Sequence, residues 1–318
     1  MDKLTRRILV GLLLGVLVYA GLGMLTDARE VIAHASRFPL GVFFGALALT
    51  LVNYALRFLK WHLYLGKLGI EVPVGESLTV FIAGMVMAVT PGKVGEVFKS
   101  FLLRESRSVP AASTAPIVVA ERMTDLLGMV LIAALGVVSF DYGRTVLGVT
   151  LVLLVVGIVI LNQRELVLGW LEWSGDLPVI GRFQNKLEEA YRSMHELVDL
   201  PIFTGTTLLS AVAWSMEGLA LYWILVALDA SGVTVYAAFF VYAISTIAGA
   251  ISFLPGGLGV TEGGMIVLLT DVFGYFDGAS AATLATYIIR FATLWFGVGL
   301  GAVALIWFRI EYGDDEEG

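Results

Sequence analysis

Several stretches of this chain contain about 18 or more residues with almost no charged side chain. Residues 8–26 and 145–163 have none, and residues 230–261 extend such a run to a length of 32. Each stretch could cross a hydrocarbon core of roughly 30 Å as a helix that rises about 1.5 Å per residue. Backbone groups inside a bilayer must bond within their own segment, which requires helices, and alternating β-barrel strands do not fit such runs. The sequence therefore predicts an all-α polytopic membrane protein.

Six full spans are predicted, at about 8–25, 39–59, 115–140, 144–161, 204–228 and 279–307. The composition agrees, because 58% of the residues are hydrophobic and 15% are charged, against roughly 25% charged residues in soluble proteins. Lysine and arginine precede the first span and follow the second and the last, which predicts cytoplasmic N- and C-termini. Arg57 and Lys60 close the second span and are expected only to extend towards the lipid headgroups. The whole chain, residues 1–318, is predicted to be one transmembrane domain of the cell (plasma) membrane.

Two further apolar segments are interrupted near their centres by proline and glycine. The first, at about 77–103, is interrupted at 90–96, and the second, at about 237–273, is interrupted at 254–264. Proline removes a helix hydrogen bond and glycine loosens the backbone, so each helix should break there. Basic residues flank the first segment on both sides, and only acidic residues flank the second. The charges predict two re-entrant hairpins, the first entering from the cytoplasm and the second from outside.

The two breaks belong to a predicted internal repeat. Matching prolines, glutamates and arginines are 164, 166 and 168 residues apart, in the pairs Pro91/Pro255, Glu96/Glu262 and Arg122/Arg290. The unit of a span, a broken hairpin and an arginine-bearing span thus occurs twice, at about 39–140 and 204–308. Because the hairpins are predicted to enter from opposite faces, the repeats are inverted, as in many secondary transporters.

Basic residues near the breaks predict an anion-binding site. The half-helix that follows each break offers unpaired N–H groups and the positive end of its dipole, which suit a phosphate group. The candidate binding residues are Lys93, Arg122 and Arg290, with the glycines Gly92, Gly95, Gly256, Gly257 and Gly259. In the alternative interpretation, the breaks merely kink ordinary spans, and acidic residues neutralise the arginines to lock the bundle. The candidate ion-pair partners are Glu96, Glu121, Asp125 and Glu262.

Carboxyl groups at membrane depth are candidates for proton coupling, since burial favours their neutral form and lets them exchange protons near neutral pH. Glu217, near the middle of the fifth span, is the strongest candidate, followed by Glu96 and Glu262. A hydrogen-bonded glutamate at a helix interface is the structural alternative for Glu217.

Other chemistries have little support in the sequence. There is no cysteine, and the histidines His34, His62 and His195 lie in separate polar segments, so no metal site and no cofactor are expected. No nucleotide-binding motif and no nucleic-acid partner are expected. Between the repeats, residues 182–198 carry apolar side chains at helical spacing, which predicts an amphipathic linker helix at the cytoplasmic surface. A homo-oligomer is possible.

The ordered set of motifs resembles a known family. Thr90–Glu96, Glu121-Arg122-x-x-Asp125 and Leu254–Glu262 are similar to motifs of the flippase-like transmembrane domain of lysylphosphatidylglycerol synthases. That domain is the membrane half of the bacterial multiple peptide resistance factor, and the resemblance runs from about Leu40 to Phe308. It implies translocation of an anionic phospholipid or related lipid. The chain ends about ten residues after the last span, without the transferase domain of full-length relatives, so synthase or other enzyme activity is not expected.

The expected function is therefore that of a lipid flippase or scramblase. A phosphate headgroup would be held by Lys93, Arg122, Arg290 and the half-helix N-termini, while the lipid chains stay in the bilayer. The expected partners are membrane lipids, either an anionic phospholipid or a polyprenyl phosphate. A secondary transporter of a small anionic solute and a non-catalytic accessory protein of membrane lipid glycosylation are the alternatives.

Overall fold

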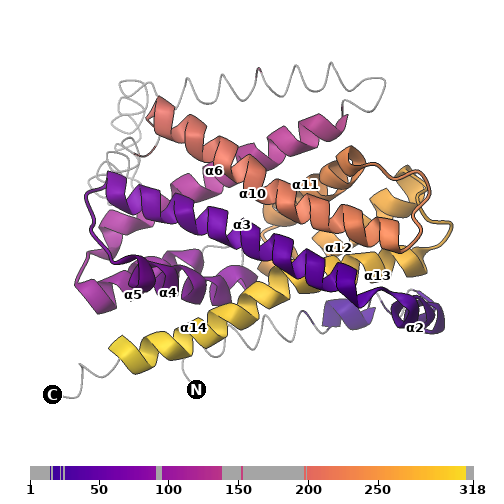
Figure 1. Ribbon diagram of the computed structural model, residues 1–318, viewed down its shortest axis with the longest axis horizontal. Helices are drawn as coiled ribbons and strands as arrows, with labels where there is room; N and C mark the ends of the chain where they lie inside the picture. The colour runs from indigo at the N-terminus through magenta and orange to yellow at the C-terminus, as the bar shows by residue number, and fades with distance from the viewer. Residues whose placement is uncertain are drawn as a thin grey trace, which may run out of the picture.

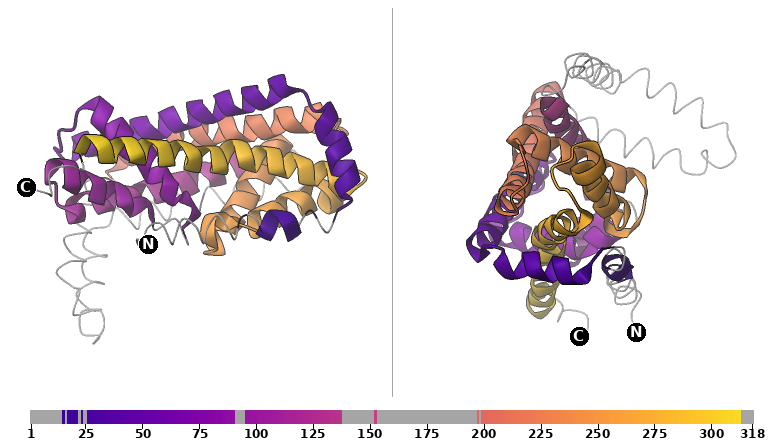
Figure 2. Two further views of the ribbon diagram at one scale, coloured as in Figure 1. Left: turned by 90° about the horizontal axis from the view of Figure 1, so that it is seen from below. Right: turned by 90° about the vertical axis from the view of Figure 1, so that its right-hand side faces the viewer.

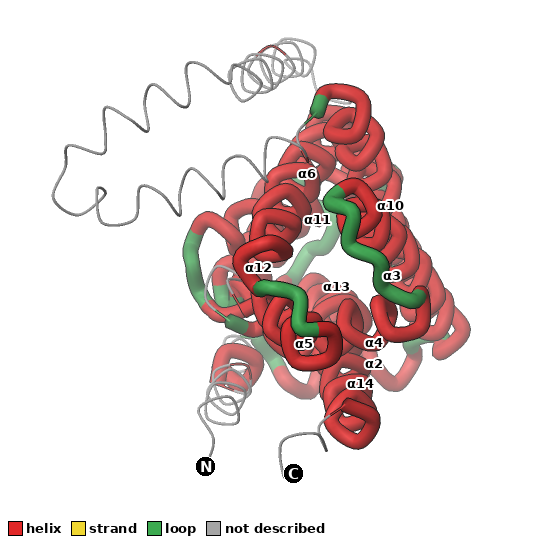
Figure 3. Tube along the Cα trace, turned by 90° about the vertical axis from the view of Figure 1, so that its left-hand side faces the viewer, coloured by secondary structure: helices red, strands yellow, loops and turns green. Residues whose placement is uncertain are grey.

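The computed structural model describes residues 26–90, 95–137 and 199–312, together with residues 15, 17–21, 23, 152 and 197. Almost all of the predicted span at 144–161 and of the linker helix at 182–198 lies outside these residues. Every regular element of the described part is helical (Figure 3). The first half contains α2 (Ala28–Arg37), α3 (Leu40–Lys67), α4 (Val74–Gly84), η1 (Met85–Val89), α5 (Phe98–Arg107) and α6 (Ala111–Val137). The second half contains α10 (Leu200–Ala227), α11 (Val235–Ile251), η4 (Pro255–Gly257), α12 (Val260–Val267), η5 (Leu268–Val272), α13 (Ala279–Arg290), η6 (Phe291–Trp295) and α14 (Phe296–Tyr312).

Long apolar helices form the frame of the molecule. Three helical stretches are apolar and long enough to cross a membrane, namely Leu40–Lys67, Leu200–Ala227 and Ala279–Tyr312. These stretches run along the length of the molecule in Figure 2. Helix α6 has a similar length of 27 residues, but it carries three charged side chains. The prediction of an all-α fold with several long apolar helices, as in a membrane protein, is therefore confirmed.

Helices α3 and α10 pack against each other and run in opposite directions (Figure 1). At one end of the molecule, α3 leads into α4, η1 and α5, and α4 contacts α5 after the chain has passed the first break. At the other end, α10 leads into α11, which contacts α12 after the second break. Each broken segment therefore folds back on itself, and the two hairpins start from opposite ends of the bundle (Figure 1).

The two breaks meet in the interior. Element η1 contacts η4, and the backbone of Gly256 lies beside Val89 and the side chain of Leu294. At the second break, φ is +61° at Gly256, +68° at Gly257 and +87° at Gly259, a region that disfavours residues with a Cβ atom. The glycines therefore permit the turn that brings the second break to the first.

A glycine of α14 allows its close packing on the first hairpin. A Cβ atom on Gly301 would lie 3.0 Å from the carbonyl oxygen of Ile82 and even closer to the amide nitrogen of Val86. Gly301→Ala is therefore expected to destabilise the protein by about 1–3 kcal/mol, because α14 must move away from a rigid backbone. Gly299 is exposed and has open space at its Cβ position, so Gly299→Ala should have no unfavourable effect. Chemical unfolding in detergent micelles measures the difference, and equal stability of the two variants would contradict the packing argument.

Candidate functional site

Buried ion pairs join α6 to α3 and to the first hairpin. The Lys60 ammonium group on α3 lies 2.5 Å from an Asp125 carboxylate oxygen and donates to the Ser210 hydroxyl at 2.7 Å. Lys99, at the start of α5, lies 2.5 Å from a carboxylate oxygen of Glu121. All three elements thus contribute charges to one buried network, which we call the α6 cluster (Lys60, Glu96, Lys99, Glu121, Arg122 and Asp125).

Arg122 is the most exposed member of the α6 cluster, with 25% of its side chain accessible. Its guanidinium group lies 2.8 Å from Asp125 and 3.1 Å from Glu96. These distances fit ion pairs, but the donor atom is not aligned for a hydrogen bond to either carboxylate. Arg122 therefore connects the first hairpin to α6 mainly through charge.

A second ion pair lies at the other break. The Arg290 Nε atom donates to Glu262 at 2.6 Å, and its Nη2 atom donates to the carbonyl oxygen of Gly256 at 2.7 Å. The other carboxylate oxygen of Glu262 accepts from the backbone N–H of Gly259 at 2.7 Å. At the start of α12, the expected anion is therefore supplied by Glu262 itself. We call Arg290 and Glu262 the α12 pair.

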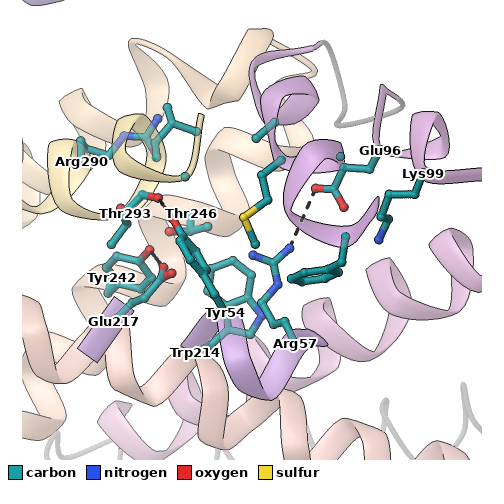
Figure 4. A pocket seen from close by; sticks show the side chains of 16 residues that line it. Tyr54, Arg57, Glu96, Lys99, Trp214, Glu217, Tyr242, Thr246, Arg290 and Thr293 are labelled. Carbon is teal, nitrogen blue, oxygen red and sulfur yellow. Dashed lines mark hydrogen bonds and ion pairs between the residues drawn. The ribbon is translucent and has the colours of Figure 1, made fainter. Parts of the chain in front are cut away.

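A cavity of about 60 Å³ separates the α6 cluster from the α12 pair. It is bounded by both hairpins and by α3, α10, α11 and the α13–α14 region, and charged, hydroxyl and aromatic side chains line it (Figure 4). A buried water needs roughly 10–15 Å³ measured in this way, so the cavity has room for several water molecules. Its charged lining residues are Arg57, Glu96, Lys99, Glu217 and Arg290.

Two phenol groups that line the cavity hold its wall in place. Tyr242 of α11 donates a hydrogen bond to the Glu217 carboxylate of α10, and Tyr54 of α3 donates to the carbonyl oxygen of Thr293 (Figure 4). Glu217 is 2% exposed, so its carboxyl group is separated from solvent and faces the cavity. Glu217, which the sequence indicates as the strongest candidate for proton coupling, therefore lies at the candidate site.

Arg57 differs from the other buried cations. Its nearest carboxylate, Glu96, lies 4.0 Å away, and this is the longest ion pair among the described residues. Its guanidinium carbon also lies 5.3 Å from the centre of the Trp214 ring, a distance that suits a cation–π contact. Arg57 therefore presents a charge to the cavity while its ion pair is weaker than those of Lys60, Lys99 and Arg290.

The predicted binding residues lie in different parts of the structure. Arg290, Glu96 and Glu217 line the cavity, whereas Arg122, Glu121 and Asp125 lie in the α6 cluster beside it. Gly256 and Gly257 form the second break, Gly259 caps α12, and Gly95 follows the first break, where its N–H donates to Thr90. Gly92 and Lys93 lie outside the described residues. The described residues contain no cluster that could hold a metal ion.

Comparison with known proteins places this architecture in a family. The family model of the lysylphosphatidylglycerol synthase transmembrane region matches residues 9–301, which include both hairpins. The chain belongs to this family. The resemblance inferred from the Pro-Gly motifs is thus confirmed.

Two relatives in this comparison are archaeal. A UPF0104 membrane protein of Methanothermobacter thermautotrophicus is 25% identical over 293 residues, covering 83% of this chain and 84% of the relative. Glycosyltransferase AglD of Haloferax volcanii is 27% identical over 154 residues, covering 46% of this chain and 25% of the relative. The first match spans most of both membrane proteins, and the second is confined to a quarter of the glycosyltransferase.

In this member of the family, two cations of α3, Arg57 and Lys60, lie elsewhere than predicted from the sequence. The prediction that Arg57 and Lys60 only extend to the headgroups is wrong, because α3 continues to Lys67, Lys60 is buried and Arg57 lines the cavity with 12% of its side chain exposed. A sequence signal for this was present, since Asn53, Arg57, Lys60 and Tyr64 recur at spacings of 4, 3 and 4 and share one helix face. Hydrogen bonds or ion pairs to other helices are made by every residue of this stripe.

Proposed function

We propose that this membrane protein moves an anionic phospholipid or a lipid-linked phosphate between the two leaflets of a membrane. The headgroup would enter the cavity between the two hairpins, and the hydrocarbon chains would stay in the bilayer. The observation that carries the proposal is a polar cavity with three cations, Arg57, Lys99 and Arg290, at the junction of two broken helices. Arginine suits a phosphate because its planar group donates two parallel hydrogen bonds.

The charges around the cavity support an exchangeable anion. Glu96 and Glu262 neutralise arginines that a phosphate could also bind, so the headgroup would replace an internal carboxylate as partner. This exchange is easiest at Arg57, where the pair is already 4.0 Å long. The ion-pair lock and the anion-binding site, which the sequence leaves as alternatives, are then two states of the same residues. Phosphate binding would open the lock.

The arrangement of the helices supports an inverted repeat. Movement of the two repeats would open the site alternately to the two sides of the membrane. Helix α6, which follows the first hairpin, packs on α11 of the second hairpin, and α14, which follows the second, packs on α4 of the first. The long helices α3 and α10 pair with each other in opposite directions. We propose that repeats at about 39–140 and 204–308 move relative to each other around the cavity, in a plasma membrane with both termini in the cytoplasm.

Reconstituted liposomes test the proposed function. Fluorescent phosphatidylglycerol should move between leaflets faster than fluorescent phosphatidylcholine of the same chain length, as measured by chemical quenching of the outer leaflet. Uptake of radiolabelled inorganic phosphate into the same liposomes is the control for a solute transporter. Phosphate uptake without lipid movement would overturn the proposal and favour the small-anion alternative.

Glu217 is proposed to couple lipid movement to protons. Its carboxyl group faces Tyr242 of α11, Tyr54 and Arg57 of α3, and Arg290 of α13 around the cavity. With Glu217 ionised, three cations and two carboxylates line the cavity, and protonation of Glu217 adds one net positive charge. Anion binding should therefore be favoured when Glu217 is protonated, which means at lower pH.

Glu217→Gln is expected to remove the dependence of lipid translocation on a pH gradient across the liposome membrane, because glutamine stays neutral. The wild-type protein should move phosphatidylglycerol faster when one side of the liposome membrane is made acidic than when both sides are at neutral pH. Glu105→Gln is the matched control, since Glu105 lies near the surface and pairs with Arg309. Unchanged pH dependence in Glu217→Gln would remove Glu217 from the coupling mechanism.

A role beside lipid glycosylation is the second candidate, and the match to a glycosyltransferase over 46% of this chain favours it. The transported lipid would then be a polyprenyl phosphate that carries a sugar. Liposomes that contain a fluorescent glycosylated polyprenyl phosphate distinguish this substrate from phosphatidylglycerol by their relative rates.

A further inference from the structure

An apolar groove lies on the outer side of α13 and η6. Its volume is about 550 Å³, and it is lined mainly by aromatic side chains, namely Tyr19, Phe43, Tyr287, Phe291 and Trp295. The ring centres of Tyr19 and Tyr287 are 4.9 Å apart, and those of Phe43 and Phe291 are 6.1 Å apart. Phe291 is 55% exposed on a helix that is apolar and long enough to cross a membrane. In a membrane crossed by this helix, the groove would face the hydrocarbon of the bilayer.

Tyr19 separates this groove from the α12 pair. Its hydroxyl accepts a hydrogen bond from Trp295 at 3.1 Å and donates to Glu262 at 3.5 Å. The same Glu262 oxygen binds Arg290 at 2.6 Å, and Arg290 also lines the polar cavity. A single phenol ring thus stands between an apolar groove on the outside and the cation of the candidate headgroup site.

We propose that the groove binds one hydrocarbon chain of an anionic phospholipid, with Tyr19 acting as the gate between the chain and the headgroup site. This inference rests on the proposed function and deepens it by locating a lateral entrance. The lining of the groove is almost entirely apolar, and a bilayer would supply phospholipid chains on that side. Arg290 provides the charge that complements the phosphate of the same lipid.

The gate explains why the tyrosine has two different neighbours. One side of its ring packs among aromatic residues, whereas its hydroxyl bonds to Glu262. A phosphate group that replaced Glu262 beside Arg290 would present its own oxygen to the Tyr19 hydroxyl, so the headgroup would be held next to the ring that borders the groove. The headgroup and one chain of the same lipid would then lie on the two sides of this ring.

Photolabelling in lipid nanodiscs tests the groove. Phosphatidylglycerol with a diazirine near the middle of one acyl chain should label the peptide that contains Ile288 and Phe291 severalfold more than the peptide that contains Val303 and Ile306. Val303 and Ile306 are the matched control, because they are 67% and 63% exposed on α14 and do not line the groove. Equal labelling of the two peptides would overturn the proposal.

Variants separate chain binding from headgroup binding. Ile288→Trp should fill the groove and abolish the preferential labelling, whereas Ile306→Trp should leave it unchanged. The double variant Glu262→Gln/Arg290→Gln keeps the shape of the pair without its charges, and it should reduce phosphatidylglycerol labelling to the level of a phosphatidylcholine probe. Preferential labelling that survives in Ile288→Trp would overturn the groove as the chain site.

The source of the chain and the proposed function are distinguished in the same experiment. A diazirine-bearing polyprenyl phosphate that labels the groove while the phosphatidylglycerol probe does not would overturn the phospholipid assignment. Lipid translocation without groove labelling would overturn the lateral entrance and leave the proposed function standing. Groove labelling without translocation would support the chain site and overturn the proposed function.

Discussion

Arg57→Gln is expected to reduce the rate of phosphatidylglycerol translocation by about ten- to a hundredfold, since a hydrogen bond to a charged group contributes about 1.5–3 kcal/mol. Arg57 is the cavity cation whose carboxylate partner is most distant, at 4.0 Å, so its charge is the most available to an incoming phosphate. Glutamine keeps much of the side-chain length and removes the charge. The fluorescent-lipid assay in liposomes measures the effect.

Two further variants show whether the loss reflects the charge and the position of Arg57. Arg57→Lys should retain part of the activity, because it keeps the charge and loses the two-pronged geometry. Arg309→Gln is the matched control, since Arg309 is 51% exposed and pairs with Glu105 far from the cavity. Normal translocation by a folded Arg57→Gln protein would contradict the assignment of Arg57 to the headgroup site.

The broken segments were the part of the fold that the sequence predicted best. Proline removes a helix hydrogen bond and glycine loosens the backbone through local effects, and the second segment, predicted at 237–273, forms helices between residues 235 and 272. Local chemistry of this kind is readable because it does not depend on which helices become neighbours.

The assignment of charges to the cavity was harder to predict. Arg57 and Lys60 resemble the basic residues that end many membrane helices, and their inward direction depends on where α3 stops and on the carboxylates that α6 supplies. Arg122 and Arg290 were predicted to occupy equivalent positions of a repeat, yet of these two only Arg290 lines the cavity. The pairing of Tyr242 with Glu217 likewise depends on the packing of α11 against α10, which no local pattern specifies.

The irregular backbone beside Arg290 was also not predicted from the sequence. The helical stretch Ala279–Tyr312 covers the predicted last span, but η6 interrupts it as a π-helix at Phe291–Trp295, immediately after Arg290. Such insertions are frequent at functional sites, because one additional residue in a turn redirects the side chains around it. The sequence here contains neither proline nor glycine, so nothing in its local composition indicated the change. The π-helix places Thr293 and Leu294 at the cavity and Phe291 at the outer groove.

The α6 cluster should dominate the stability of the protein, and Asp125→Leu is expected to lower the free energy of unfolding by about 3–5 kcal/mol, because it leaves a buried cation without its carboxylate. Lys60 is 1% exposed, so water does not replace the lost partner. The double variant Lys60→Met/Asp125→Leu should recover much of this loss, since no unpaired ammonium group remains and Arg122 keeps Glu96 at 3.1 Å.

Unfolding in mixed detergent micelles measures the free energies of unfolding of these variants. The exposed pair Glu105/Arg309 is the control. Glu105→Leu/Arg309→Met should change the free energy of unfolding by less than about 1 kcal/mol, as is usual for surface ion pairs. If the double variant of the α6 cluster were as unstable as Asp125→Leu alone, the cost would come from lost packing around residue 125 and not from an unpaired charge. The expected recovery instead means that Asp125 stabilises the fold mainly by neutralising the buried charge of Lys60.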